Sequence, residues 1–262
     1  MFPDEAGNFL KEEDVKNFLE KALELSPDMP EALMQMGLRK RRGFFGFNDN
    51  EDEAKDWLSK AIQLKPDYAA AFNNRAMLFY HSTNEDRIDK DKVEKAKINC
   101  KNAVVDLTEA LRIRSFDAIY HLNRGIFHLR LEEHKEAVED FSGAINYASD
   151  VLKDKLKTDV LILNLRGKEY VELKEYRKAI EDFSETLRLR DNDLSSESKN
   201  SKPDYVDTLL MRGKAYHLAG EKDKAKADIE EYLNRIQKLG YDKGCAEEEI
   251  FKHIGVMPED IL

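Results

Sequence analysis

The apolar positions along the chain follow the period of short amphipathic helices. Alanine recurs at an interval of seven residues with a larger apolar residue between, as in Ala54, Leu58 and Ala61. The same spacing returns further along the chain in Ala103, Leu107 and Ala110. Residues four and seven positions apart share one face of an α-helix. The pattern therefore predicts helices that pack through a face containing small side chains.

A second small residue lies twelve residues before this helical motif in three places. The pairs are Gly125 and Ala137, Gly167 and Ala179, and Gly213 and Ala225. An arginine precedes each glycine, and Arg75 before Ala76 adds a fourth copy. Self-similarity at a regular interval is the signature of a repeat protein. The chain is therefore predicted to consist of repeated pairs of helices.

The repeated pattern resembles the tetratricopeptide repeat, a 34-residue helix–turn–helix unit. Its aromatic residue, three places after the small one, appears here as Phe79, Tyr170 and Tyr216, although two units depart from it. Its closing proline is kept as Pro27 and Pro66 and is replaced later in the chain. The resemblance covers most of the chain. It implies an all-α fold, a right-handed α–α superhelix of about five units with a half-repeat at the amino end and a capping helix at the carboxyl end.

We expect one solenoid over residues 1–262. Its parts are a half-repeat at 11–27, repeat 1 at 30–66 with an inserted loop at 40–50, repeat 2 at 69–115 with an insertion at 82–97, repeat 3 at 118–149, repeat 4 at 159–191, repeat 5 at 205–238 and a cap at 245–262. The insertion of repeat 2 alternates acidic and basic residues, which favours a solvent-facing helical extension.

The loop inserted in repeat 1 carries three phenylalanines among glycines, namely Phe44, Phe45 and Phe47. If exposed, they would form a second contact for a partner, because exposed apolar patches usually mark an interaction site. The alternative is that they fold back and seal the core of the amino-terminal half-repeat. Burial is favoured, since most large aromatic side chains are buried.

Charge and composition exclude several classes of function. The chain has 43 Lys and Arg against 53 Asp and Glu, a net charge of −10, whereas a nucleic-acid-binding domain usually carries a basic surface. No run of about 18 uncharged apolar residues is present, so no membrane-spanning helix is expected. The amino end has no signal-peptide pattern, and two cysteines cannot form a disulfide framework. A cytoplasmic protein is expected, although a chain whose leader had been removed would look the same.

The resemblance also implies where a partner binds, because the first helix of each unit lines the concave groove in this family. The groove residues so implied are Met34, Leu38, Asn73, Asn74, Met77, Tyr80, Ile119, Asn123, Ile126, Asn164 and Lys168. We expect a peptide or helix of a partner protein whose backbone bonds to Asn74, Asn123 or Asn164, since an amide both donates and accepts hydrogen bonds. The alternative is that the apolar members only pack between neighbouring helices.

Two anion-binding functions can be weighed against the same positions. The repeated Arg75, Arg124, Arg166 and Arg212 could bind phosphate, but their fixed place beside the small residue favours a structural bond to a neighbouring acid or carbonyl. One subgroup of the family clamps the acidic tails of chaperones with lysines, asparagines and an arginine. Of the matching places in repeats 1 to 3, only Asn74 conforms, so binding of a chaperone tail is rejected.

Catalysis has little support in the sequence. It contains no glycine-rich phosphate loop, paired-histidine zinc motif or Gly-x-Ser-x-Gly elbow. His121, His128 and His134 could form a metal site, but the first two fall at packing positions. We therefore expect no enzyme activity, no cofactor and no metal, and a scaffold or adaptor for protein–protein interaction. The alternative is a structural repeat protein that forms a homo-oligomer through its amino-terminal half-repeat.

Overall fold

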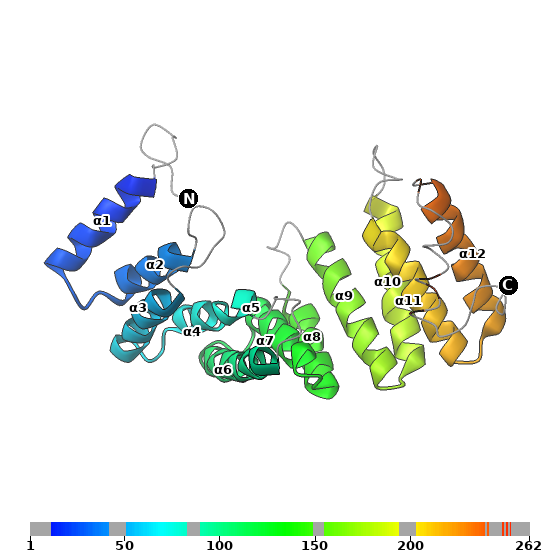
Figure 1. Ribbon diagram of the computed structural model, residues 1–262, viewed down its shortest axis with the longest axis horizontal. Helices are drawn as coiled ribbons and strands as arrows, with labels where there is room; N and C mark the ends of the chain where they lie inside the picture. The colour runs from blue at the N-terminus through cyan, green and yellow to red at the C-terminus, as the bar shows by residue number, and fades with distance from the viewer. Residues whose placement is uncertain are drawn as a thin grey trace. The chain divides into compact units, whose positions relative to one another are not determined.

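The computed structural model describes residues 12–41, 51–82, 90–148, 155–193 and 203–238, with single residues 240, 248, 250 and 252. All regular secondary structure in these ranges is helical (Figure 1), which confirms the predicted all-α fold. The chain divides into two compact units, Met1–Leu131 and Glu132–Leu262. Each unit has its own hydrophobic core.

The first unit contains seven helices in its described part. They are α1 (Glu12–Leu25), α2 (Pro30–Arg41), α3 (Glu51–Leu64), α4 (Ala69–Ala76), α5 (Phe79–Ser82), α6 (Lys90–Ile113) and α7 (Ala118–Arg130). Helix α2 packs on α3, and α4 packs on α6. Proline begins α2, where its missing N–H costs no helical hydrogen bond. The Asp117 side chain caps α7 by accepting the backbone N–H of Ile119 at 3.1 Å and of Tyr120 at 3.3 Å.

The described part of the second unit contains five helices. They are α8 (His134–Tyr147), α9 (Lys155–Glu172), α10 (Tyr176–Asp193), α11 (Pro203–Leu218) and α12 (Lys222–Lys238). Helix α9 packs on α10, and α11 packs on α12. Helix α8 also contacts α9, and α10 contacts α11, so each second helix meets the first helix of the next pair. In both units a helix therefore buries its apolar face against its own partner and against the next pair, as a repeat architecture requires.

Small residues bring the paired helices close together, as the sequence pattern predicts. Ala54, Ala61, Ala179 and Ala225 are fully buried. A Cβ atom added to Gly167 would lie 2.7 Å from the ring of Phe183, and one added to Gly37 would lie 2.8 Å from Leu58 Cγ. At these two places the partner helix fills the space that a side chain would need.

The inserted segments are described in part. Helix α6 begins at Lys90 and so includes part of the insertion predicted at 82–97. Residues 42–50, with Phe44, Phe45 and Phe47, lie outside the described ranges, as does most of the predicted cap. Within the cap, Ile250 is fully buried in the cluster that holds Ile229 and Tyr232. The division into five repeats stays a prediction.

A pair of glycine substitutions tests the close approach of the helices. We expect Gly167→Ala to lower the free energy of unfolding by about 1–3 kcal/mol, because the new methyl group overlaps the Phe183 ring. Gly213→Ala is the matched control. Its Cβ would lie 3.4 Å or more from its neighbours, and alanine favours the helix by up to about 1 kcal/mol. Urea unfolding of both variants measures the difference, and equal effects would contradict the packing described.

Candidate functional site

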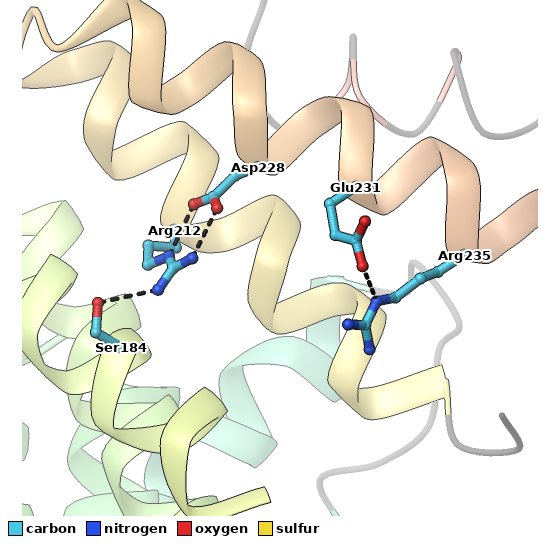
Figure 2. Close-up of polar contacts among 5 residues, drawn as sticks. All are labelled: Ser184, Arg212, Asp228, Glu231 and Arg235. Atoms are coloured by element: carbon cyan, nitrogen blue, oxygen red, sulfur yellow. Dashed lines mark hydrogen bonds and ion pairs between the residues drawn. The ribbon is translucent and has the colours of Figure 1, made fainter. Parts of the chain in front are cut away.

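The repeated arginines are half-buried between helices. Each of three guanidinium groups makes two hydrogen bonds of 2.6 to 2.8 Å to one aspartate of its own second helix. The pairs are Arg75 with Asp106, Arg166 with Asp182, and Arg212 with Asp228. A third bond runs to a serine of the preceding second helix, as from Arg212 to Ser184 at 3.2 Å (Figure 2). These three arginines therefore hold helices together, in agreement with the predicted structural role, and Arg124 donates to Thr108 Oγ1 of α6 at 3.2 Å.

The first helices of unit 1 contact one another through asparagine side chains. Asn123 of α7 donates a hydrogen bond to Asn73 Oδ1 of α4 at 2.8 Å. Asn74 of α4 donates to Met34 Sδ of α2 at 3.7 Å. We call the surface formed by Asn73, Asn74 and Asn123 the asparagine face. It brings together predicted groove residues of α4 and α7 and is bonded to the buried Met34 of α2.

Amide groups of the asparagine face keep unused hydrogen-bonding capacity. Within the described part of the chain, the side-chain oxygens of Asn74 and Asn123 accept no hydrogen bond. Both residues are half-buried, so a ligand can reach them from one side. A free amide oxygen can accept the backbone N–H of a bound peptide.

The apolar groove residues separate into buried and accessible side chains. Met34 is buried in the core of unit 1, and Leu38 and Met77 pack against core clusters. Ile119 is 50% exposed, and Ile126 is half-buried. Met34 therefore serves the core, as the alternative interpretation expects, whereas Ile119 offers an apolar contact beside Asn123.

Tyr80 is fixed at one end of unit 1 by two neighbours from α7. The Arg130 guanidinium lies 4.2 Å from the ring centroid and donates to the Tyr80 carbonyl at 3.1 Å. The Phe127 ring meets Tyr80 edge-on, with centroids 6.5 Å apart. A cation over an aromatic face adds to the stability of such a contact. Tyr80 is thus held by contacts with α7 and is still half-exposed.

The predicted groove residues of unit 2 form a smaller set. Asn164 of α9 donates to Thr208 Oγ1 of α11 at 3.0 Å, again joining two first helices. Its own amide oxygen is buried and has no hydrogen-bond partner in the described part of the chain. Lys168 lies exposed one turn further along α9.

Unit 2 contains a buried carboxyl group beside a histidine that the sequence pattern does not predict. Glu169 of α9 is only 5% exposed, and His134 Nδ1 of α8 lies 2.7 Å from its carboxylate. Burial raises the pKa of Glu169, and the bond to His134 opposes that rise. The corresponding places of the other units hold Arg39, Leu78, Phe127 and Ala215. Because this position ranges from charged to apolar among the units, the burial of Glu169 could not be predicted from the repeat pattern.

The histidines do not gather into a metal site in the part of the chain that is described. His121 contacts the Ser115 carbonyl at 3.1 Å, and His134 contacts Glu169. Among the described residues there is no group of three side chains suited to hold a metal ion. The helices described here also include none long and apolar enough to cross a membrane.

Comparison with known proteins identifies the repeat and the fold. Residues 206–238 match the family model of the tetratricopeptide repeat. A search of curated protein sequences finds no match. YrrB, described as a TPR protein with an unusual peptide-binding site, has a TM-score of 0.63 and 14% identity, over 83% of this chain and 91% of its own.

Two further solved structures are similar to this chain. The MamA protein gives a TM-score of 0.59 at 17% identity, over 80% of this chain and 92% of its own. PilF of Pseudomonas aeruginosa gives 0.53 at 20% identity, over 88% of this chain and 86% of its own. At these identities the likeness establishes a shared fold.

Removing one half-buried arginine tests the structural role of the ion pairs. We expect Arg166→Met to lower the free energy of unfolding by about 3 kcal/mol at pH 7, because it leaves the buried Asp182 carboxylate unpaired. Burial raises the pKa of Asp182 even beside the arginine, so acid that protonates this carboxylate should reduce the loss. Urea unfolding at pH 7 and pH 4 measures both effects. The control is Arg188→Met, which breaks an exposed pair with Glu185 and should change stability little.

The buried Glu169 should make stability depend on pH. A carboxyl group whose pKa is raised on folding contributes most stability below its unfolded pKa, and that contribution is lost as the pH rises through the folded pKa. We therefore expect Glu169→Gln to gain stability relative to the native chain between about pH 4 and pH 7. Urea unfolding across this range measures the difference. The exposed Glu172→Gln variant should run parallel to the native chain, and a parallel curve for Glu169→Gln would contradict the prediction.

Proposed function

We propose that this chain, a tetratricopeptide repeat protein, is a non-enzymatic scaffold that binds a peptide or helix of a partner protein on the asparagine face. The observation that carries this proposal is the set of bonds between first helices, Asn123 to Asn73 and Asn74 to Met34. These bonds fix the amide groups in place before a ligand arrives. A preorganised site loses less entropy on binding than a mobile one.

The chemistry of the face favours a peptide with alternating polar backbone and apolar side-chain contacts. Asn74 and Asn123 offer amide oxygens to backbone N–H groups of a ligand. Ile119, half exposed beside Asn123 in the same helix, offers an apolar contact. Partly buried Met77 is adaptable in shape, so it can accommodate different apolar side chains. Few fixed polar groups within an apolar surface are typical of sites that orient a ligand.

Support for a binding function also comes from the fold. YrrB, whose structure is similar, is described as having a peptide-binding site. This is a likeness of fold at 14% identity, so the position of the site in this chain depends on its own residues. A homo-oligomer formed through the amino-terminal half-repeat is the second candidate, and the exposed Phe18 of α1 favours an interaction at that end.

A pull-down with paired variants tests the asparagine face. We expect the chain carrying Asn74→Ala and Asn123→Ala to capture at least tenfold less of the partner from native lysate than the unaltered chain does. Each lost amide removes a hydrogen bond to the ligand. Quantitative mass spectrometry of the captured proteins gives the ratio. Circular dichroism verifies that the variant keeps its helices.

The matched control carries Asn102→Ala and Asn146→Ala. Both asparagines are exposed and lie on second helices, α6 and α8, so this variant should retain the partner. Equal capture by the two double variants would show that binding lies elsewhere. Capture of the chain itself in place of another protein would support the homo-oligomer.

A further inference from the structure

Helix α1 occupies the place of a second helix that has no first helix before it in the described part of the chain. Val15, Leu19 and Ala22 repeat the spacing of Ala54, Leu58 and Ala61. Leu19 packs into a cluster with Ala32 and Met36 of the next first helix, α2. Figure 1 shows α1 at the amino-terminal end of unit 1, beyond α2. One side of α1 is therefore packed as in the other second helices, and the opposite side is open.

The open side carries a phenylalanine at a position that is buried elsewhere. The position concerned lies three residues after the first residue of the helical motif. In the second helices α6, α8, α10 and α12 it is an aspartate that is between 2% and 7% exposed, namely Asp106, Asp140, Asp182 and Asp228. In α6, α10 and α12 an arginine of the first helix in the same pair covers this aspartate. At the same position α1 holds Phe18, which is 72% exposed.

The side chain at this position indicates what would cover it. In α3 the position is Trp57, which packs against the cluster containing Met36 of its own first helix. Where Trp57 replaces the aspartate, Met36 replaces the arginine, so an apolar side chain covers the aromatic one. Leu25, seven residues after Phe18 on the same face of α1, is 81% exposed. Together they form an apolar stripe with the spacing of a helix-packing surface.

The acidic residues of α1 favour a basic helix as the partner of this stripe. Helix α1 contains five acidic residues and two lysines, and Glu13, Asp14, Glu20 and Glu24 are exposed. A second copy of α1 would bring acidic residues against acidic residues, and the whole chain carries a net charge of −10. Opposite charges around an apolar contact favour association, whereas like charges oppose it.

We infer that the open face of α1 binds a basic amphipathic helix of a partner protein, seated where the first helix of a pair would lie against α1. Apolar residues of that helix cover Phe18 and Leu25, and its lysines or arginines face the acidic residues of α1. Binding of an amphipathic helix by its apolar stripe is a common mode of recognition. This surface is separate from the asparagine face and lies on different residues.

Site-specific photo-crosslinking on the full chain tests this inference. The chain carries Phe18→p-benzoylphenylalanine, which keeps an aromatic ring at the position. The probe is a 16-residue peptide of leucine, lysine and alanine with its leucines on one helical face, and a second peptide of the same composition has its leucines spread around the helix. We expect the amphipathic peptide to crosslink at least tenfold more than the spread one. Leu25→Glu in the same chain should lower its yield at least tenfold.

A second labelled chain provides the control for nonspecific attraction to an acidic protein. Phe116→p-benzoylphenylalanine places the crosslinker at a residue that is 73% exposed but outside α1, where both peptides should react equally. Equal yields of the two peptides at position 18 would overturn the inference. Crosslinks from position 18 to a second copy of the chain, or to residues 1–11 with exclusion of the peptide, would also overturn it, since they would identify a different occupant.

Discussion

The arrangement of these helices depends on a half-buried arginine that bonds to two different helices at once. A guanidinium group has five N–H donors in one plane, and here two of them hold the aspartate of the paired second helix while a third reaches a hydroxyl of the preceding second helix. The same arginine therefore fixes the helices within a pair and the pair against its neighbour. Apolar burial supplies most of the stability, but it is not directional, whereas these bonds specify one register.

The pair formed by α2 and α3 has apolar residues in place of this arginine and its aspartate. In the pair α2–α3 the arginine and aspartate positions hold Met36 and Trp57, which join an apolar cluster that includes Leu19 of α1. A buried ion pair and a well-packed apolar pair can be of similar stability, so this exchange keeps the packing while giving up the directional bonds. The equivalent position of α1 holds Phe18, which is apolar and exposed. The position that is aspartate in α6, α10 and α12 is thus tryptophan in α3 and phenylalanine in α1, where it forms a surface suited to a partner.

Much of this fold could be predicted from the sequence, because its rules are local. The spacing of Gly167, Ala179 and Phe183 reports a close contact between two short helices, and the same spacing recurs along the chain. The bond between Asn123 and Asn73 could not be predicted, since it joins helices fifty residues apart through their relative placement. Whether Met34 faced the groove or the core depended on the same placement, and it is buried. The burial of Glu169 could not be predicted either, since it depends on how α8 packs on α9.

The two faces of the first helices differ in how closely they are packed, and this difference determines which face can accept substitutions. The face toward the second helices carries the small residues and the arginines, where even a methyl group at Gly167 would meet the Phe183 ring. The opposite face carries half-buried Asn74 and Asn123 and half-exposed Ile119. If this face binds a ligand as proposed, substitutions there would change the ligand with less effect on the fold than substitutions at Gly167. The asparagine bonds between first helices would add rigidity to the face, and a rigid face retains more of its interaction energy as affinity.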